Sequence, residues 1–372
     1  MEDKLRILMT ADTVGGVWTY AVSLCNALEK YDVEIHLMTM GGRPDKQQLD
    51  QIKSSKNLQL YSSDYKLEWM ENPWEDVHQA AKWIREVYDK IQPDIIHFNN
   101  YGQVDQMWDC PVVTVFHSCV QTWWEAVKQQ SLPEEWNKYQ QTVQNALLSS
   151  DMLIAPTKAI LDQAHKAYDI SGFSKVICNG SSSKVYASQK KEPFILTAGR
   201  IWDDAKNISV LCRIARHLKW PVYVAGTDTD SLKNKEEKFP NIFFLGQLSS
   251  ASLQELMLKA SLFVMPAKYE PFGLAILEAA RAGCTLALGN ISTLNEIWGR
   301  TALYFDPNNN GEALRALQQL IGDKTLRKNL ARRSMKRAEK FTEEAMAKNY
   351  FEVYKSLITQ RKITTFKNRK TA

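Results

Sequence analysis

The chain has 372 residues, more than one ordinary domain needs, and we expect two domains of ordinary size. Its 44% hydrophobic and 24% charged residues are typical of a soluble globular protein, and no apolar run approaches the roughly 18–20 residues that span a membrane. The six cysteines are scattered without a C-x-x-C pair, which argues against a structural zinc site. Because no signal peptide precedes the first strand, we expect a cytoplasmic protein with reduced thiols.

The net charge of +5 is distributed unevenly along the chain. Residues 1–185 carry 17 Lys and Arg against 24 Asp and Glu, a net charge of −7, whereas residues 186–372 carry 30 against 18, a net charge of +12. The basic second half suits a phosphate-rich ligand, and it equally suits nucleic acid or an anionic surface. Part of the excess lies at residues 359–372, which hold five basic residues and no acidic one. We interpret that segment as a solvated tail.

Strand-like and helix-like segments alternate in the first half of the chain, a pattern typical of a parallel sheet with crossover helices. The polar region between residues 42 and 66 interrupts this pattern, and we expect one helix and an irregular connection there. The expected strands are residues 5–9, 33–40, 94–98, 111–116 and 152–155, and the expected helices are residues 17–30, residues 77–91 and a helix from about residue 158.

Candidate ligand-binding residues follow three of these strands. The loop TADTVGG places Gly15 and Gly16 between a strand and a helix, as at phosphate-binding turns, although the dinucleotide fingerprint G-x-G-x-x-G is absent. His97 lies near the end of one strand, and His117 directly follows the next. Because the carboxyl ends of parallel strands meet at one edge of a sheet, these groups can converge there. The alternatives are an ordinary turn at the glycines and, at His97, a buried histidine that is satisfied by hydrogen bonds.

The sequence CNGSSS at residues 178–183 is typical of a turn and linker, and we place the domain boundary there. Strands and helices then alternate again, so the sequence predicts two doubly wound α/β domains. The expected strands are residues 194–198, 221–225, 242–246, 261–265, 285–288 and 302–305, and the expected helices are residues 207–218, 250–260, 294–298, 310–322, 324–341 and 343–358.

The most informative stretch is SLFVMPAKYEPFGLAILEAARAG, residues 261–283. It predicts a strand, a loop with two prolines and a glycine, and a helix from Leu274, so the loop presents backbone N–H groups at a helix N-terminus. Such a terminus binds anions, and two carboxylates, Glu270 and Glu278, lie on either side of it. Carboxylates accept hydrogen bonds from sugar hydroxyls, so the stretch suits a ligand with both phosphates and hydroxyls. The alternative is a capped, buried helix with an incidental pair of glutamates.

A second stretch, GRIWDDAKN at residues 199–207, also follows an expected strand and precedes an expected helix. The side chains of Arg200 and Lys206 can both reach a diphosphate bound at the carboxyl edge of the sheet. A single lysine such as Lys206 is usually a surface residue. Because Lys206 occurs together with Arg200 and with the loop before Leu274, a phosphate site is favoured.

These motifs resemble those of glycosyltransferase family 4, whose members are retaining enzymes of the GT-B fold. The matching elements are the E-x7-E motif of Glu270 and Glu278, a G-R-x5-K-N element, an N-terminal glycine loop and a strand that ends in His117. They occur in the family's order over nearly the whole chain. Ser118 stands where the family often has Asp, so no role of that Asp is carried over.

The resemblance implies two Rossmann-like domains that face each other across a cleft. Residues 1–184 would form the acceptor-side domain, joined by the C-terminal helix within residues 343–372, and residues 185–342 would bind the nucleotide sugar. Glu278 would bind ribose hydroxyls and Glu270 the donor sugar. The backbone N–H groups of Phe272, Gly273 and Leu274 would bind a phosphate. Arg200 and Lys206 would bind the leaving diphosphate. His117, Gly15 and Gly16 would line the acceptor-side wall of the implied cleft.

The implied reaction is transfer of a sugar, of hexosyltransferase type, from a nucleotide-diphosphate sugar to an acceptor hydroxyl, with retained anomeric configuration. The acceptor would be a sugar, a lipid-linked sugar or a small molecule, as in glycan, glycolipid or glycoside biosynthesis. We expect neither a cofactor nor a metal, because basic residues and a helix dipole can stabilise the leaving group. Asp228 and Asp230 spell a D-x-D sequence, which we interpret as a solvated loop.

Three alternatives remain at this point. A nucleotide-sugar epimerase or a phosphorylase of the same fold would share the phosphate loops. A nucleic-acid or polyanion-binding module would use the basic second half, but it leaves Glu270 and Glu278 unexplained. A peripheral membrane enzyme with a lipid acceptor is compatible with the basic tail, although the acidic first half lacks an evident basic amphipathic helix. Eight of the eleven tryptophans precede residue 137, and Trp123 and Trp124 can stack on a sugar ring or fill a core.

Overall fold

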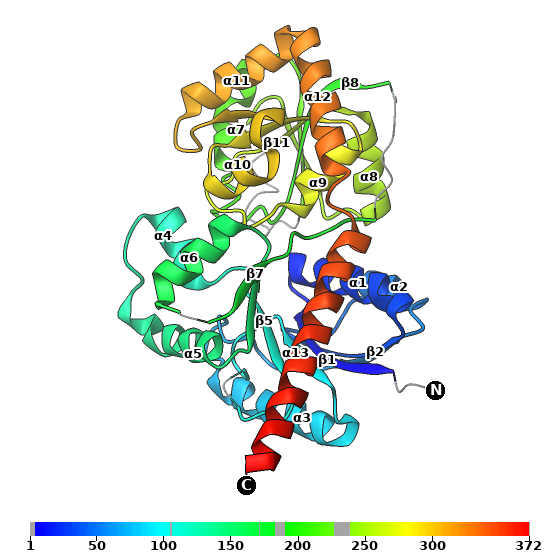
Figure 1. Cartoon of the computed structure of the whole chain (residues 1–372). Helices are drawn as coiled ribbons and strands as arrows, with labels where there is room; N and C mark the ends of the chain where they lie inside the picture. Colours follow the sequence, from blue (N-terminus) through cyan, green and yellow to red (C-terminus); the bar gives the residue numbers. More distant parts are fainter. Residues whose placement is uncertain (1–3, 105, 171, 183–189, 227–238, 372) are drawn as a thin grey trace. The chain divides into compact units, whose positions relative to one another are not determined.

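The computed structural model describes residues 4–104, 106–170, 172–182, 190–226 and 239–371 (Figure 1). The expected D-x-D sequence at Asp228 and Asp230 lies outside these residues. None of the described helices is both long and apolar enough to cross a membrane.

The chain divides into two compact units. The first contains Met1–Thr122, Gln130–Gly180 and Glu343–Ala372, and the second contains Trp123–Gln129 and Ser181–Thr342. The division therefore falls inside the CNGSSS sequence, four residues before the boundary drawn at residue 184 from the sequence. The short segment Trp123–Gln129, which the sequence analysis assigned to the first domain, groups with the second unit.

In the first unit, seven of the described strands form one parallel sheet with the order β3-β2-β1-β4-β5-β6-β7. The central strands are buried on both faces, which explains why their sequences are almost continuously apolar. The strands are β1 (Leu5–Asp12), β2 (Val33–Met40), β3 (Leu58–Ser62), β4 (Ile95–Phe98), β5 (Val112–Val115), β6 (Met152–Ala155) and β7 (Ser174–Val176).

Helices cover this sheet, and the last helix of the chain returns to it. This last helix runs beside α1 (Figure 1). Its stripe of Met346, Ala347, Tyr350, Val353 and Tyr354 has helical spacing and is buried with residues of α1 and the sheet. The helices are α1 (Gly16–Leu28), α2 (Lys46–Ile52), α3 (Trp74–Ile91), α5 (Asn137–Leu148), α6 (Lys158–Tyr168) and α13 (Glu343–Thr371), with 3-10 turns at Glu29–Tyr31 and Glu134–Trp136. Helix α4 (Val120–Lys128) begins in this unit, and most of it groups with the second unit.

In the second unit, six of the described strands form a parallel sheet with the order β10-β9-β8-β11-β12-β13. The strands are β8 (Glu192–Ala198), β9 (Val222–Ala225), β10 (Ile242–Gly246), β11 (Ala260–Met265), β12 (Thr285–Gly289) and β13 (Leu303–Phe305). The helices are α7 (Ser209–Ile214), α8 (Ser250–Lys259), α9 (Leu274–Arg281), α10 (Ser292–Trp298), α11 (Asn310–Gly322) and α12 (Lys324–Ala338), with 3-10 turns at Ala215–His217 and Gly299–Thr301.

Both sheets are doubly wound, which confirms the fold class expected from the sequence. Strand order reverses between β1 and β4 in the first unit and between β8 and β11 in the second. In open α/β sheets, ligands bind beyond the carboxyl ends of the strands at this reversal. The loops that follow β1, β4, β8 and β11 are therefore the places to look for a site in each unit.

Several expected boundaries were wrong. The polar region between residues 42 and 66 contains a strand, β3, as well as the expected helix. Its side chains are half-buried or exposed because β3 is the edge of the sheet, so it lacks the apolar run of an inner strand. Strand β1 continues to Asp12, into the segment expected to be a loop. Helix α7 begins at Ser209 and ends at Ile214, much shorter than the expected 207–218.

Candidate active site

The loops after β8 and β11 lie side by side at the strand-order reversal of the second unit. The Lys268 backbone N–H donates to the Ala205 carbonyl at 2.9 Å. The Asn207 side-chain amide donates to the carbonyls of Pro266 at 2.9 Å and Pro307 at 2.7 Å. Asn207 has a left-handed backbone with φ of 55°, a conformation that asparagine adopts more readily than most residues. These bonds hold the two loops in one fixed arrangement.

An ion pair joins the functional side chains of the two loops. Lys206 Nζ lies 2.6 Å from Glu270 Oε2, and the two side chains are only 15% and 11% exposed. The methylene carbons of Lys206 run beside Gly199, close enough that a Cβ there would make ordinary van der Waals contact with them. An ammonium group has three N–H donors, so Lys206 can bind Glu270 and still donate to a ligand.

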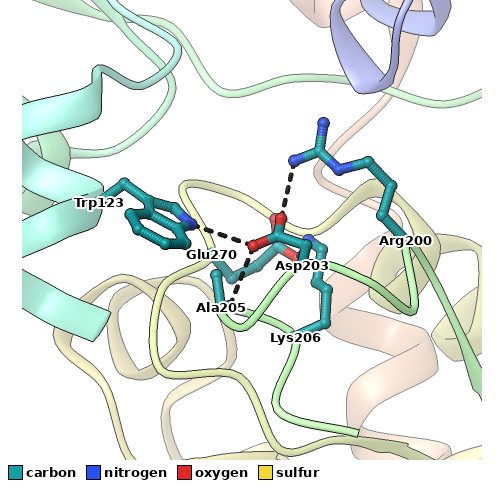
Figure 2. A network of polar contacts seen from close by, with 6 residues as sticks. All are labelled: Trp123, Arg200, Asp203, Ala205, Lys206 and Glu270. Atoms are coloured by element: carbon teal, nitrogen blue, oxygen red, sulfur yellow. Dashed lines mark hydrogen bonds and ion pairs between the residues drawn. The ribbon is translucent and has the colours of Figure 1, made fainter. Parts of the chain in front are cut away.

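Arg200 is held by a carboxylate that the sequence analysis did not single out. Asp203 is buried and accepts hydrogen bonds from Arg200 Nη2, Trp123 Nε1 and the Ala205 backbone N–H, each at 3.0 Å. Figure 2 shows this carboxylate between the Trp123 indole and the Arg200 guanidinium. Burial by itself would raise the pKa of Asp203, but Arg200, the two N–H donors and Lys206 outweigh it and lower the pKa. Asp203 is therefore a stable anion that orients Arg200.

Helix α9 begins directly after the loop that carries Glu270. Gly273 precedes the helix with φ of 87°, in the left-handed region that favours glycine, and no side chain caps the helix. The first N–H groups of a helix lack intrahelical acceptors, so those of Leu274 and its neighbours can bind an anion. Phe272 is buried edge-on against Phe341, which anchors the loop. Glu278 lies half-buried one turn further along the helix.

In the first unit, a cluster of polar side chains lies at the carboxyl ends of β1, β4 and β5. His117 Nε2 is 2.7 Å and His97 Nε2 is 3.2 Å from the side-chain oxygen of Asn99. The Asn99 side-chain amide donates to the Thr10 carbonyl at 2.7 Å. His97 Nδ1 is 2.6 Å from the Tyr354 hydroxyl on α13. Burial lowers the pKa of both histidines to about 3, so both imidazoles are neutral at physiological pH.

Gly15 and Gly16 lie beyond the end of β1, where α1 begins. Gly15 has extended backbone, with φ of 176°, and Gly16 is the first residue of the helix. A Cβ placed on Gly16 would meet no heavy atom of the described residues within 4 Å. No packing constraint therefore requires glycine at position 16, which leaves close approach of a ligand to the backbone as a reason for it.

Each half of this arrangement matches a family model. The model described as Glycosyltransferase Family 4 matches residues 14–182, and the model described as Glycosyl transferases group 1 matches residues 179–337. Together they cover residues 14–337, which include the loops that carry His117, Arg200, Lys206 and Glu270. The chain belongs to glycosyltransferase family 4. The family resemblance expected from the sequence is confirmed.

Solved structures agree with the GT-B fold of this family 4 chain. Sucrose-phosphate synthase from Thermosynechococcus elongatus has a TM-score of 0.83 at 18% identity, with 96% of this chain and 100% of that chain covered. The Anabaena protein HepE, solved in complex with UDP and glucose, has a TM-score of 0.73 at 16% identity, with 95% and 100% covered. At these identities the likeness establishes the fold.

A curated relative matches over a shorter segment. The O-antigen chain mannosyltransferase B of Escherichia coli is 26% identical over 170 residues, which are 46% of this chain. The match spans 39% of that mannosyltransferase's length.

In this family 4 chain, the structure brings the expected site residues together within each unit. Arg200, Lys206, Glu270 and the start of α9 share one sheet edge in the second unit, and His117 and the glycine loop share the corresponding edge in the first. Sequence reasoning missed Asn99 and Asp203. Asp203 was detectable as a carboxylate between the two basic residues of one loop, whereas no signal pointed to Asn99. Among the described residues, no group of three or more His, Cys, Asp or Glu side chains could hold a metal ion.

Proposed function

We propose that the protein is a retaining glycosyltransferase that moves a hexose from a nucleotide-diphosphate sugar to an acceptor hydroxyl. The observation that carries this proposal is the Lys206–Glu270 pair beside the uncapped start of α9. It places a cation, backbone N–H donors and a carboxylate in one small region. Nucleotide sugars need this combination, since they carry a diphosphate next to hydroxyl groups. The UDP and glucose bound by the structural neighbour HepE support the same ligand class.

Each site residue has a distinct role in this proposal. The N–H groups of Phe272, Gly273 and Leu274 bind a phosphate oxygen at the positive end of the α9 dipole. Glu278 accepts hydrogen bonds from the ribose, and Glu270 accepts them from the transferred sugar. Arg200 and Lys206 bind the leaving diphosphate. Gly15, Gly16 and His117 contribute from the carboxyl edge of the first sheet.

The leaving group is stabilised by side chains rather than by a metal in this proposal. Negative charge grows on the diphosphate as the glycosidic bond breaks, and preorganised donors act on that charge without reorganisation. Asp203 holds Arg200 in place for this task. Retention follows if the acceptor attacks from the face that the diphosphate leaves, with the departing phosphate taking the acceptor's proton. Activity should then be unchanged by a chelator, and strict dependence on an added divalent cation would contradict the metal-independent mechanism.

No disulfide joins any of the six cysteines, all of which lie in the described part of the chain. Reduced thiols are typical of a reducing compartment, which supports our proposal of a cytoplasmic enzyme.

A thermal-shift panel of nucleoside diphosphates and nucleotide sugars tests donor binding. A ligand at a hundredfold over its Kd stabilises the native state by about 2.7 kcal/mol, so a true donor must raise the melting temperature. The double variant Lys206→Ala, Glu270→Gln should lose this shift. The matched control is Lys259→Ala, Glu255→Gln, which removes an ion pair of the same 2.6 Å length from the exposed face of α8.

Product analysis with the donor found in the panel tests the reaction. Transfer with retained anomeric configuration, dependent on an added acceptor, supports the proposal. Conversion of the donor sugar without an acceptor would identify an epimerase instead. Release of a sugar phosphate from a glycan would identify a phosphorylase.

A further inference from the structure

We infer that Asn99 is a positioning residue that holds His117 as the Nε2–H tautomer, so that His117 Nδ1 is presented as a hydrogen-bond acceptor to a hydroxyl group of the substrate. The inference rests on the proposed function for the identity of that hydroxyl, which belongs to a sugar. The tautomer itself follows from contacts inside the first unit.

The orientation of the Asn99 side chain is set by a backbone carbonyl. The Thr10 carbonyl oxygen can only accept hydrogen bonds, and it lies 2.7 Å from the Asn99 side-chain nitrogen. The NH2 group must therefore face Thr10, and the oxygen of the same side chain must face the two histidines. The Asn99 backbone N–H also donates to the Thr10 hydroxyl at 3.1 Å, which fixes the residue at a second point.

The oxygen of Asn99 then determines the proton positions on both imidazoles. An amide oxygen accepts and does not donate, so the His117 Nε2 at 2.7 Å and the His97 Nε2 at 3.2 Å must both carry hydrogen. The other contacts of His97 are consistent with this assignment. The Tyr20 hydroxyl oxygen, 3.3 Å from His97 Nε2, can accept from the same N–H. His97 Nδ1 lies 2.6 Å from the Tyr354 hydroxyl, which donates to it. Burial raises the pKa of Tyr354 well above its ordinary value, so the hydroxyl keeps the proton that it donates.

The consequence for His117 is a lone pair on Nδ1 that can accept a hydrogen bond. Among the described residues, His117 Nδ1 makes no hydrogen bond, and the residue is half-buried beyond the end of β5. The titratable groups next to it are Tyr20 on α1, whose ring contacts the imidazole, and His97 on β4, which Tyr350 and Tyr354 on α13 contact in turn. None of these carries a charge near neutral pH, because burial lowers the pKa of His97 and raises the pKa of each tyrosine.

A neutral imidazole that offers a lone pair selects among ligand groups. It accepts a hydrogen bond from a hydroxyl, whereas an ionised phosphate oxygen has no proton to donate and is repelled. His117 therefore suits a sugar hydroxyl and disfavours the diphosphate, so the sugar and the diphosphate of a nucleotide sugar are bound by different side chains. If Asn99 did not hold the ring, the imidazole could present an N–H donor and lose this selectivity.

Imidazole nitrogen NMR tests the tautomer directly, without requiring activity. The signals of His117 are assigned by their absence from His117→Gln, and we expect a protonated Nε2 and an unprotonated Nδ1 from about pH 5 to pH 8. A protonated Nδ1 in the wild-type protein overturns the inference. Asn99→Leu, which removes the acceptor, should give a mixture of the two tautomers; an unchanged spectrum in that variant would also overturn it.

Kinetics tests the consequence for the substrate. Asn99→Leu should reduce kcat/KM for the nucleotide sugar by up to about tenfold, the effect of losing one hydrogen bond completely, while the Kd of the bare nucleoside diphosphate stays unchanged. Asn99→Asp keeps an acceptor but adds a negative charge beside His117, which must raise the pKa of the imidazole. This variant should therefore lose activity on the acid side of neutrality, where the wild-type enzyme does not.

Asn57→Ala is the matched control for both experiments. Asn57 also lies in the first unit, and its side-chain amide donates to the Cys25 carbonyl at 3.1 Å, as that of Asn99 does to Thr10. Asn57→Ala should lower the folding stability about as much as Asn99→Leu does. It should leave the His117 spectrum and kcat/KM unchanged. If the control changes both, Asn99 acts only through stability and the inference fails. If the wild-type protein shows the expected tautomer but transfers no sugar, the proposed function fails and the tautomer assignment stands.

Discussion

Lys206 Nζ lies 2.6 Å from Glu270 Oε2, and this pair links the loop after β8 to the loop after β11. Both side chains are largely shielded from water, so removing one partner leaves the other as a poorly solvated charge. In the proposed function, this pair places a cation that binds phosphate and a carboxylate that binds hydroxyls within hydrogen-bonding distance of each other. A nucleotide sugar presents these two kinds of group on adjacent atoms.

The first prediction separates catalysis from binding at Arg200 and Lys206. If both stabilise the leaving diphosphate, their effect grows as the glycosidic bond breaks, so Arg200→Ala and Lys206→Ala should each lower kcat by about 10²–10³. The double variant should lose less than the product of the two effects, since both act on one charge. Steady-state kinetics checks this, with Lys259→Ala as the control for loss of a paired lysine on an exposed surface. If Arg200→Ala raises KM and leaves kcat unchanged, Arg200 binds the substrate and the transition state equally and does not stabilise the leaving group.

The second prediction concerns Glu278, half-buried on α9. Glu278→Gln keeps the shape of the side chain and weakens charge-assisted hydrogen bonds to the ribose, each worth roughly 1.5–3 kcal/mol. Donor affinity should therefore fall at least about tenfold, an effect of about 1.4 kcal/mol. Calorimetry with a nucleoside diphosphate and its 2′-deoxy analogue isolates the contact, because the variant should no longer distinguish the two. Full discrimination in Glu278→Gln would remove Glu278 from the ribose site.

The third prediction uses the open space beside Gly16. Gly16→Ala adds a Cβ that meets no atom of the described protein within 4 Å, so the variant should fold normally. If the backbone there approaches a diphosphate, the added methyl group must push the ligand away, and donor affinity should fall by about tenfold. The matched control is Gly322→Ala at the end of α11, where a Cβ also meets nothing within 4 Å. Unchanged donor affinity in Gly16→Ala would exclude the glycine loop from the donor site.

The fourth prediction concerns the pH dependence of stability. His97 is fully buried, and burial lowers its pKa to about 3, whereas the unfolded chain has a histidine pKa of about 6.5. Between these values the unfolded state binds a proton that the folded state does not, so stability falls as the pH falls. The contribution of His97 to the free energy of unfolding should change by about 1.4 kcal/mol per pH unit between about pH 4 and pH 6.

Denaturant unfolding of wild type and His97→Gln over this pH range measures that contribution. The variant should show a shallower dependence of unfolding free energy on pH, whatever its absolute stability. His78→Gln, at an exposed position of α3, is the matched control. Parallel curves for wild type and His97→Gln would show that His97 titrates alike in the folded and unfolded chains.

Local patterns in the sequence were enough to locate most strands and both phosphate-type loops. β2 and β6 lie where their apolar runs predict them, because an inner strand is largely apolar and is bounded by turn residues. The loops before Ser209 and Leu274 were predictable because glycine and proline break strands and helices within a few residues. Edge strand β3 was missed because it is half-exposed, and its pairing with β2 carries no local apolar signature.

The sequence by itself therefore determined the two doubly wound domains, the family motifs and the residues expected at the donor site. Only the tertiary structure decided which side chains support them. Asp203 and Trp123 are 80 residues apart, and His97 and Tyr354 are 257 apart. His117 and Asn99 are 18 apart and follow two neighbouring strands. A hydrogen bond requires two atoms to lie within about 3 Å with the correct orientation. That geometry arises from the packing of strands and helices far apart in the chain, and residue periodicity contains no information about it.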